Sequence, residues 1–540
     1  ISCSLVGSEM CIRDSNMEFK EKRIMVVCKE TYSYPLYFLA RKWLVNNKVA
    51  AFFFNPIETM YSKCLLNDTT YYAYKKLEGL KLYTSNRIAK EFTDKLYSNE
   101  YDYAYVDMIE KDYTHFMNLN MQILSTQFFT RHYHYRNYMH TCTYAQQLLW
   151  LELNYKNIIS IIDDFEPDFI LDTDSAELAR TILREVCYKK NIPYVSIEYP
   201  RYEFNVGYTY SLGYSLMPTL VKSYRYYESL GNDSLKDEID YVVDFRNKSS
   251  IMHDQYKGDV TSQYKANGLL VTFKRLLGDI KYFYIDQDVK AGCRKLKKSN
   301  PLLYNSSFEF IKFFIRYEYT KQKLYRKNKY FQNPIDGEKY VYMPLHLIPE
   351  SSTFTLAPIY INELSIIEAV SKSLPAGWWL YVKEHQAMLG ERGEAFYKAV
   401  NKLPNVKMVQ LNYYQDPKPW IIKSQGVVTI SGTSAYEAAM LGKHAIVFSD
   451  VPFSLIEGVH RCKSFEDLPA IISLFNNELD NIKSCASYIA AVKRYSYPMN
   501  LKLMLNQGLH ILRGKADLDK QYQASLDSLE KLYLLAIENY

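Results

Sequence analysis

The sequence has no cysteine motif spaced for metal binding and no apolar run long enough to cross a membrane. Its nine cysteines are scattered, without a Cys-x-x-Cys pair or a Cys/His cluster at zinc-ligand spacing, which indicates reduced cytosolic thiols. A bilayer-spanning helix needs about 20 apolar residues. The run Ile24–Cys28 is also too short for the core of a signal peptide. These absences predict a cytoplasmic protein that is soluble or peripheral at the inner membrane.

The length of 540 residues exceeds what one hydrophobic core supports, so two core domains with a cleft between them are expected. Apolar residues make up 48% of the chain and charged residues 23%, which is typical of globular proteins. Residues 1–16, ISCSLVGSEMCIRDSN, show no periodicity and join abruptly to Met17. We interpret them as a translated sequencing adapter and exclude them from the fold.

Residues 17–215 alternate between strand and helix patterns. A helix is predicted at 35–45, where apolar residues recur at helical spacing. Buried strands are predicted where short apolar runs occur, at 23–27, 49–54, 168–171 and 194–200. Continuous apolar strands joined by helices indicate a parallel sheet covered on both faces. Residues 17–215 are therefore predicted to form an N-terminal Rossmann-like domain.

Residues 216–335 lack this alternation, and their Lys/Tyr/Phe-rich helical stretches predict a helical insertion. Its segment Lys274–Lys329 holds fifteen Lys and Arg against five Asp and Glu, whereas the net charge of the whole chain is only +6. Three interpretations remain open: a solvated helical face, contact with the inner-membrane surface, or contact with an anionic glycan. Aromatic residues could insert into a membrane or form the core of the insertion: Phe273, Phe283, Phe310, Phe313 and Phe314.

The strand and helix alternation returns at residue 338. Strands are predicted in the apolar runs KYVYMPL, WWLYVKEH, LPNVKMVQ, GVVTISG and HAIVFSD, with a helix at 362–373. This second doubly wound unit spans residues 336–465. Residues 466–540 are predicted to close the chain with amphipathic helices. The predicted fold class is α/β, with two Rossmann-like, doubly wound parallel-sheet domains, a helical insertion and C-terminal helices.

Three loops of the second unit follow predicted strands, where ligands of parallel sheets bind. They are His346–Thr353, Lys383–Gln386 and Ser431–Ala438. In the third, Gly432 lets a ligand approach the backbone, and Thr433 and Ser434 open a helix whose dipole favours a phosphate. The alternative is an S-x-x-E capping box between Ser434 and Glu437, which stabilises the helix without a ligand.

The second loop carries two basic side chains at the end of a strand. Lys383 and His385 lie two residues apart, so both could point into one cleft and neutralise a departing phosphate. Glu384 would then face away or anchor a neighbouring loop. The alternative is that the pair is surface decoration.

The runs PLHLIPESST, LPAGWWLYVKEH, ERGEAFYKAVNKLPNVKMV and GVVTISGTSAYEAAMLGKHAIVF resemble the capsule polysaccharide biosynthesis family over residues 338–450. That family contains GT-B glycosyltransferases, including Kdo transferases, and its nucleotide site is similar in plan to that of bacterial sialyltransferases. The resemblance implies that Lys383 and His385 match a KxHP element for donor phosphate, although Gln386 stands where proline is usual. It also implies that an SGT-x-x-x-E element contributes nucleotide-binding residues: Ser431, Gly432, Thr433, Ser434 and Glu437.

The catalytic base is expected from the N-terminal domain. Asp172, Thr173 and Asp174 end a predicted strand, and Glu177 lies one helical turn after Asp174. Asp174 is the first candidate and Glu177 the second. The alternative is helix capping, with Asp174 as N-cap and Glu177 at the reciprocal position.

No metal site is predicted. The string DTD at 172–174 is a literal DxD, the metal-nucleotide signature of GT-A enzymes, but a second α/β unit with its own phosphate loop favours GT-B. His132 and His134 form an HxH without nearby carboxylates or cysteines, which favours a structural role. No cofactor is expected beyond the nucleotide-sugar substrate.

The predicted function is a glycosyltransferase that moves a sugar from a nucleotide donor to a surface polysaccharide in capsule or lipopolysaccharide biosynthesis. A CMP-linked sugar is one candidate for the donor. The predicted partners are a nucleotide-sugar donor, a glycan or lipid-linked acceptor and the inner-membrane surface. One alternative is a nucleotide-sugar 2-epimerase of similar fold. The other is a non-catalytic polysaccharide- or nucleic-acid-binding protein, but no nucleic-acid motif is found, so nucleic acid is not an expected partner.

Overall fold

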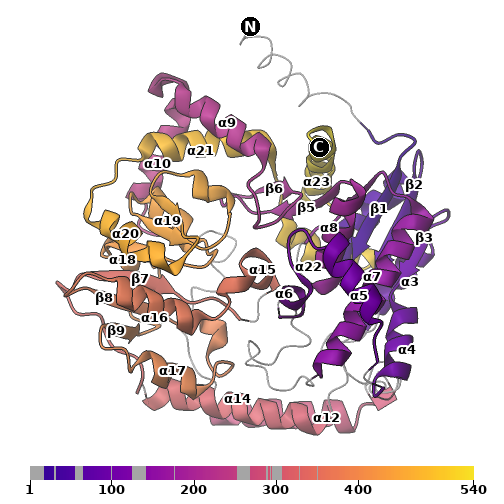
Figure 1. Cartoon of the computed structure of the whole chain (residues 1–540), viewed down its shortest axis with the longest axis horizontal. Helices are drawn as coiled ribbons and strands as arrows, with labels where there is room; N and C mark the ends of the chain where they lie inside the picture. The colour runs from indigo at the N-terminus through magenta and orange to yellow at the C-terminus, as the bar shows by residue number, and fades with distance from the viewer. Residues whose placement is uncertain are drawn as a thin grey trace.

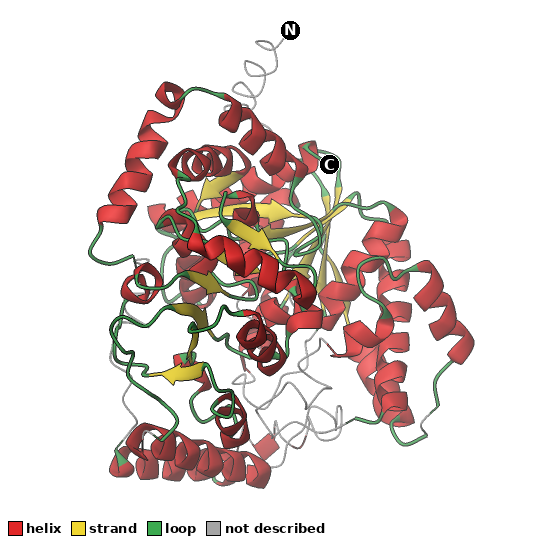
Figure 2. Ribbon diagram, turned by 60° about the vertical axis from the view of Figure 1, so that its left-hand side comes forward, coloured by secondary structure: helices red, strands yellow, loops and turns green. Residues whose placement is uncertain are grey.

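The structure is a computed structural model in which most of the chain can be described. The described residues are 18–29, 32–54, 65–98, 100–124, 142–174, 177–251, 268–287, 290–291, 294, 307–327, 329–348 and 351–540. Two mainly parallel sheets, surrounded by helices, lie in separate halves of the molecule (Figures 1 and 2). This is the two-domain α/β arrangement of GT-B proteins, and it confirms the predicted fold class.

The N-terminal sheet contains seven of the described strands, in the order β13-β6-β5-β4-β1-β2-β3. Their bounds are β1 Arg23–Cys28, β2 Lys48–Phe53, β3 Lys81–Thr84, β4 Phe169–Leu171, β5 Tyr194–Glu198, β6 Asn205–Thr209 and β13 Ser496–Pro498. The strands β1 to β5 pair in parallel, whereas β6 pairs antiparallel with both β5 and β13. The chain runs from β1 outward to β3 and then returns to β4 on the other side, so the strand order reverses between β1 and β4.

Both faces of this sheet are covered by helices, which explains why its strands are continuously apolar. Ile24 and Val26 of β1 face one core, while Met25 and Val27 face another. Helices α2 (Ser33–Trp43), α22 (Leu501–Leu512) and α23 (Lys520–Glu538) cover the first face, and α5 (Tyr103–Asp112), α7 (Tyr144–Phe165) and α8 (Leu178–Lys190) cover the second.

The C-terminal sheet is parallel throughout its described pairings, with the order β12-β11-β10-β7-β8-β9. The bounds are β7 Tyr340–Pro344, β8 Trp379–Lys383, β9 Val406–Val409, β10 Gly426–Val428, β11 Ala445–Val447 and β12 Val459–Arg461. Its helices include α15 (Ser351–Leu356), α16 (Glu363–Ser373), α17 (Glu394–Val400), α18 (Pro417–Ile422), α19 (Ser434–Met440) and α20 (Leu468–Ser473). Here the strand order reverses between β7 and β10.

Helix α21 (Ile482–Tyr495) joins the two halves. It packs against α9 (Pro218–Ser229) and α10 (Lys236–Asn247), and it also contacts β6 of the first sheet and α19 of the second domain. One apolar core therefore runs from Ile24 in the N-terminal domain to Val459 in the C-terminal domain. The chain then returns to the N-terminal sheet through β13.

Four short strands were missed in the sequence: β3, β6, β12 and β13. β13 lies within 466–540, for which only helices were expected, and it ends on Pro498 at the sheet edge, where a missing N–H is tolerated. The five described cysteines are buried. None of the helices in the described chain combines the length and apolar character that a membrane crossing requires.

Within 216–335 the described helices are α9, α10, α12 (Leu269–Tyr284) and α14 (Ser307–Lys327), apart from short turns and single helical residues. The pair α12 and α14 lies at the lower edge of the molecule in Figure 1. Residues 1–16 and the HxH at His132 and His134 lie outside the described residues.

Candidate functional site

The loops after β7 and β10 meet where the strand order of the C-terminal sheet reverses, which is where open parallel sheets bind ligands. His346 follows β7, and its Nε2 lies 3.2 Å from Oγ1 of Thr429, the residue after β10. The backbone N–H of Gly432 donates to the same Thr429 hydroxyl at 3.2 Å. A Cβ at Gly432 would lie only 2.5 Å from that oxygen and 3.2 Å from His346 Nε2, so the turn after β10 favours glycine where it meets the loop after β7.

A buried arginine between two carboxylates holds the loops after β7 and β8 in place. Arg392 Nη2 lies 2.6 Å from Glu363 Oε2, and Arg392 Nε lies 2.9 Å from Glu384 Oε2. Glu363 accepts the backbone N–H of His346 at 2.6 Å, and Glu384 accepts that of His385 at 2.8 Å. Glu384 thus anchors the loop, one of the two roles that the sequence suggested for it.

The two carboxylates share the Arg392 guanidinium. Burial opposes ionisation of Glu363, but Arg392 and His346 hold its pKa below the usual value. Burial raises the pKa of Glu384, a shift that Arg392 opposes and Glu363 reinforces. The side chains of Glu363, Glu384 and Arg392 are fully shielded from solvent. Buried charges that are hydrogen-bonded to one another are costly to disturb, so the two loops they carry are rigid supports for whatever binds there.

Lys383, the last residue of β8, is half-buried, and its Nζ lies 5.6 Å from the centre of the Trp420 ring. Burial lowers the pKa of Lys383 to about 8, although the nearby carboxylates of Asp416 and Glu437 oppose this shift. No carboxylate lies within ion-pair distance of Lys383 in the described part of the chain. Such an ammonium group would gain a strong partner from a phosphate.

Glu437, on α19, influences the pKa of Lys383, and Lys383 in turn influences that of Glu437. Burial raises the pKa of Glu437 to about 7, with Asp416 adding to the shift and Arg201 and Lys383 opposing it. A carboxylate beside a phosphate site can accept hydrogen bonds from ribose hydroxyls, as in dinucleotide-binding folds.

His385 lies at the exposed end of the β8 loop. Its Nδ1 accepts the backbone N–H of Ala387 at 3.3 Å, at the start of the short helix η5 (Gln386–Met388). With Nδ1 as the acceptor, the neutral ring carries its proton on Nε2. The imidazole is therefore oriented to donate a hydrogen bond outward, without the proline that usually follows this histidine in the resembling family.

The capping box that the sequence allowed between Ser434 and Glu437 is not formed. Thr433 is the N-cap of α19, its side chain makes no capping hydrogen bond, and the charges that act on Glu437 are those of Asp416, Arg201 and Lys383. Ser431 is buried, whereas Gly432, Thr433 and Ser434 are half-buried. Because α19 spans only seven residues, its dipole is small, and the hydroxyl and N–H donors of this turn matter more.

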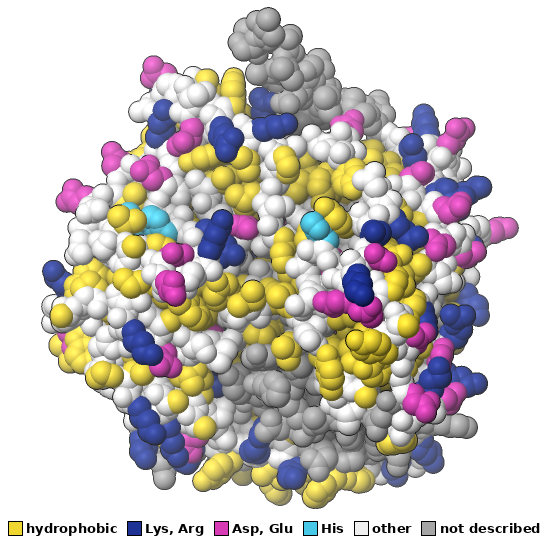
Figure 3. Space-filling view, viewed as in Figure 1, with side chains coloured by type: hydrophobic (Ala, Val, Ile, Leu, Met, Phe, Trp, Pro, Cys, Tyr) yellow, Lys and Arg dark blue, Asp and Glu magenta, His cyan; other side chains and the backbone are white. Residues whose placement is uncertain are grey.

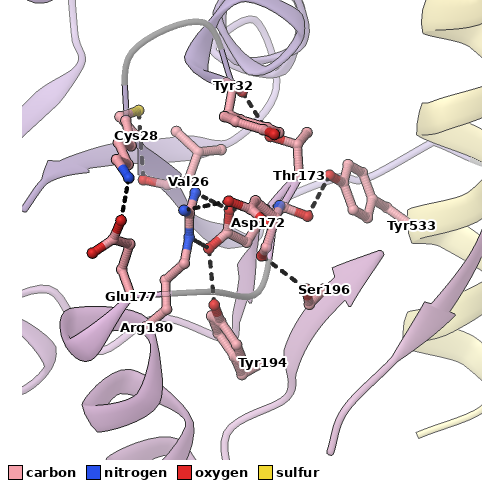
Figure 4. Close-up of polar contacts among 12 residues, drawn as sticks. Val26, Cys28, Tyr32, Asp172, Thr173, Glu177, Arg180, Tyr194, Ser196 and Tyr533 are labelled. Carbon is pink, nitrogen blue, oxygen red and sulfur yellow. Dashed lines mark hydrogen bonds and ion pairs between the residues drawn. The ribbon is translucent and has the colours of Figure 1, made fainter. Parts of the chain in front are cut away.

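The loops after β1 and β4 meet in the same way where the order of the N-terminal sheet reverses. Thr173 donates from its hydroxyl to the carbonyl of Tyr32 at 2.6 Å, and Lys29 is ion-paired with Glu177 (Figure 4). The candidate carboxylates therefore sit at the ligand-binding edge of their sheet, as the sequence suggested.

Arg180 organises the β4 loop from α8 (Figure 4). Its Nε and Nη2 lie 2.7 and 2.9 Å from the two oxygens of Asp172, and its Nη1 lies 2.9 Å from Asp174 Oδ2. Tyr194 donates a further hydrogen bond to Asp172 at 2.8 Å. Asp172 and Arg180 are completely buried, whereas the side chain of Asp174 remains 24% exposed. Of the three residues, only Asp174 can reach a substrate without a change in this cluster.

The capping interpretation of Asp174 and Glu177 is wrong. The N-cap of α8 is Glu177 itself, and its side chain makes no capping hydrogen bond. Glu177 has φ 109°, a strained conformation for a residue other than glycine, and its carboxylate pairs with Lys29. The side chain of Glu177 is only 6% exposed, so it is less accessible than that of Asp174.

Arg201 was missed in the sequence, because nothing local distinguishes it from a surface arginine. It follows β5 with φ 71°, and its Nε is buried without a hydrogen-bond partner among the described residues. Its charge acts on Glu437 in the opposite domain. Nearby, Gly213 of the N-terminal domain accepts the N–H of Asp450 at 3.4 Å, and a Cβ on Gly213 would lie 2.8 Å from Leu356. Residues that follow β5 and β6 thus lie close to the C-terminal domain.

The structure brings the C-terminal candidates together on one sheet edge: Lys383, His385, Ser431, Gly432, Thr433, Ser434 and Glu437. Asp174 and Glu177 lie on the other sheet, and no hydrogen bond or ion pair among described residues links them to the C-terminal loops. Asp416 and Trp420 both interact with Lys383, and neither was identified in the sequence. In the described chain, no group of three His, Cys, Asp or Glu side chains is placed to hold a metal.

Comparisons with known proteins give distant likenesses only. No family model and no curated protein sequence matches the chain. Among solved structures, the beta Kdo 2,7 transferase KpsC of Thermosulfurimonas dismutans matches at 9% identity over 66% of this chain and 89% of its own, with a TM-score of 0.28. The S. aureus MnaA-UDP co-structure matches at 10% identity over 92% and 98%, with a TM-score of 0.27.

A third match is the UDP-GlcNAc 2-epimerase of Methanocaldococcus jannaschii in complex with UDP-GlcNAc and UDP, at 10% identity over 86% of this chain and 97% of its own, with a TM-score of 0.26. The solved structures that match thus include Kdo transferases and UDP-GlcNAc 2-epimerases. TM-scores this low carry no argument about the chemistry of this chain, which rests on its own residues.

Proposed function

We propose that the protein is an enzyme, a glycosyltransferase that moves a sugar from a nucleotide donor to a surface polysaccharide acceptor. The observation that carries this proposal is the environment of Lys383. Lys383 is a half-buried ammonium group at the end of β8, with a pKa of about 8 and no carboxylate within ion-pair distance among the described residues, and both Lys383 and Arg201 act electrostatically on Glu437. Cations of this kind, focused at a sheet edge, favour a phosphate.

The roles follow from the positions of the side chains. Lys383, His385 and the hydroxyls of Thr433 and Ser434 bind the donor phosphate, and Glu437 accepts hydrogen bonds from ribose. Stabilising the leaving phosphate supplies much of the rate, because preorganised charge acts most strongly on charge that develops in the transition state. Asp174 is the proposed base that removes the proton from the acceptor hydroxyl. No metal or other cofactor has a role in this scheme.

The proposal also places the enzyme in the cytoplasm, peripheral to the inner membrane, where lipid-linked glycan acceptors are made. The acceptor then binds to the N-terminal domain, on the edge formed by the loops after β1 and β4. Asp174 is the partly exposed carboxylate of this edge. A sugar held by the C-terminal domain would be presented to Asp174 across the contact between the two domains.

The reaction class can be tested with nucleotide-sugars alone. A 2-epimerase changes the configuration of its nucleotide-sugar without any acceptor, whereas a transferase yields free nucleotide when acceptor or water takes the sugar. Proton NMR of the protein with each nucleotide-sugar distinguishes these products. Stable epimer formation without acceptor would replace the transferase proposal with the epimerase.

Removal of the phosphate contacts is expected to weaken nucleotide binding without unfolding the protein. The double variant His385→Ala/Thr433→Ala should lose about tenfold to 100-fold in affinity, because the two contacts together contribute about 1.4–2.8 kcal/mol. Isothermal titration with CMP, UDP and their sugars measures the loss. Lys402→Ala, on the same domain but away from the loops, is the matched control. Unchanged affinity in the folded double variant for every nucleotide that binds would remove this assignment.

Nucleotide affinity is expected to fall as the pH rises above about 8. In the free protein the pKa of Lys383 is about 8, and a bound phosphate raises it. Below pH 8 Lys383 is already charged in the free protein, so affinity has its full value. Above pH 8 Lys383 must take up a proton when the nucleotide binds. Affinity then falls by up to about tenfold per pH unit. Lys383→Arg stays charged and should lose this fall. A flat profile in the unmodified protein between pH 7 and 9.5 would contradict the role of Lys383.

A further inference from the structure

Helix α12 exposes an apolar stripe where a helix of a globular domain normally buries one. The stripe consists of Leu269, Leu270, Phe273, Leu277, Ile280 and Tyr284, which recur at spacings of three and four residues along one side of the helix. Leu269, Leu270 and Phe273 are 65%, 78% and 57% exposed. Phe283 is the buried residue of α12. The apolar side of this helix therefore faces outward along most of its length.

The other side of α12 packs against α14, so the orientation of the stripe is fixed. Arg275 Nη1 lies 3.4 Å from Glu318 Oε1 of α14, and the Arg275 guanidinium lies 5.5 Å from the ring centre of Phe314. Phe283 and Phe314 are 5% and 7% exposed and occupy the contact between the helices. Of the aromatics that the sequence suggested for membrane insertion, these two are core residues, Phe313 is half-buried, and only Phe273 is exposed. The side chain of Phe310 lies outside the described residues.

Basic residues flank the stripe. Lys274 and Lys281 are two helical turns apart and exposed, at the edge of the stripe on the side away from α14. The acid of α12 is Asp279, which is half-buried. The exposed side of α14 repeats the pattern, with Phe308, Ile315 and Tyr319 next to Lys312 and Arg316. Figure 3 shows hydrophobic and basic side chains together along this lower edge.

We infer that the α12 stripe docks on an anionic lipid surface. Leucine and phenylalanine side chains at helical spacing, bordered by lysines, suit a helix that lies in the plane of a membrane interface, with its apolar side in the acyl boundary and its cations at the headgroups. A second protein would need acidic groups opposite Lys274, Lys281, Lys312 and Arg316 as well as a matching apolar groove. A leaflet of anionic lipid offers both features without a specific shape.

The inference is tested by flotation of the purified protein with vesicles of phosphatidylcholine alone or mixed with phosphatidylglycerol. The stripe variant is Leu270→Ser/Phe273→Ser/Leu277→Ser. The matched control is Val45→Ser/Tyr97→Ser, which removes equally exposed apolar residues, 79% and 84%, from the N-terminal domain. The unmodified protein and the control should float with the anionic vesicles, and the stripe variant should partition at least about tenfold less.

The charge contribution is tested by Lys274→Ser/Lys281→Ser, which should reduce flotation at low salt and weaken the dependence of binding on salt. Failure of the unmodified protein to float at low salt, or equal flotation of the stripe variant, overturns the inference. Sedimentation velocity tests whether a second copy of the protein covers the stripe instead. If the unmodified protein is a dimer that does not float, and the stripe variant is a monomer, this surface is an interface between two copies. Neither result depends on the reaction catalysed, so failure here leaves the nucleotide site untouched.

Discussion

Replacement of Arg180 by alanine is expected to lower the free energy of unfolding by about 3–5 kcal/mol, the largest single effect on stability that we predict. The change would leave the fully buried carboxylate of Asp172 without its two charge-assisted contacts at 2.7 and 2.9 Å. Asp174 would lose its contact at 2.9 Å as well. Denaturation followed by tryptophan fluorescence and circular dichroism measures the first unfolding transition.

The control removes the charges together. Asp172→Leu/Arg180→Met replaces the buried pair by apolar groups, and such replacements are often neutral or stabilising. We therefore expect this double variant to be more stable than Arg180→Ala, although Tyr194 loses its acceptor. A loss below about 1 kcal/mol for Arg180→Ala, or a double variant less stable than the single one, would show that the cluster is not the support of the β4 loop.

Asp174→Asn is expected to reduce the rate of sugar transfer by about 10²- to 10⁴-fold, the usual contribution of a general base. Asparagine keeps an oxygen that can accept from Arg180 Nη1, so the loop should stay in place while the base is lost. Turnover is measured with the nucleotide-sugar that binds best, in single-turnover assays with acceptor or water.

A structural role for Asp174 predicts a different pattern. If Asp174 only positions the loop, the Asn variant should keep its rate and its dependence of rate on pH. Asp163→Asn removes an exposed carboxylate that pairs with Lys190 and is the matched control. Full activity in Asp174→Asn together with loss in Glu177→Gln would move the assignment to the second candidate.

The alternation of strands and helices in both domains was predictable from the sequence. The parallel strands are buried on both faces of their sheets, which leaves continuous apolar runs such as RIMVVC and YVYMP. The antiparallel strands β6 and β13, at one end of the N-terminal sheet, left no such run. β13 is three residues long and finds its partner some 290 residues away in the chain, so its pairing comes from the tertiary packing of α21 and α23.

Residues of the candidate site were predictable where a local sequence pattern marks them. They were not predictable where their role depends on partners that are distant in the chain. Gly432 follows a strand, Lys383 ends one, and both stand out in the sequence. Arg392 and Arg201 do not, because one is buried by Glu363 and Glu384 from other loops and the other acts across the domains. The capping alternatives failed for a related reason: Glu177 pairs with Lys29, and the charges that act on Glu437 come from other elements, at Asp416, Arg201 and Lys383.

The most direct measurement is hydrogen–deuterium exchange of the protein with and without the nucleotide-sugar that stabilises it most in a thermal-shift screen. A donor at 100 times its dissociation constant should add about 2.7 kcal/mol of stability, which is enough to show local protection. The account predicts that protection concentrates in the loops 345–348, 383–388 and 431–437. Protection confined to other parts of the chain, with these three loops unchanged, would contradict it.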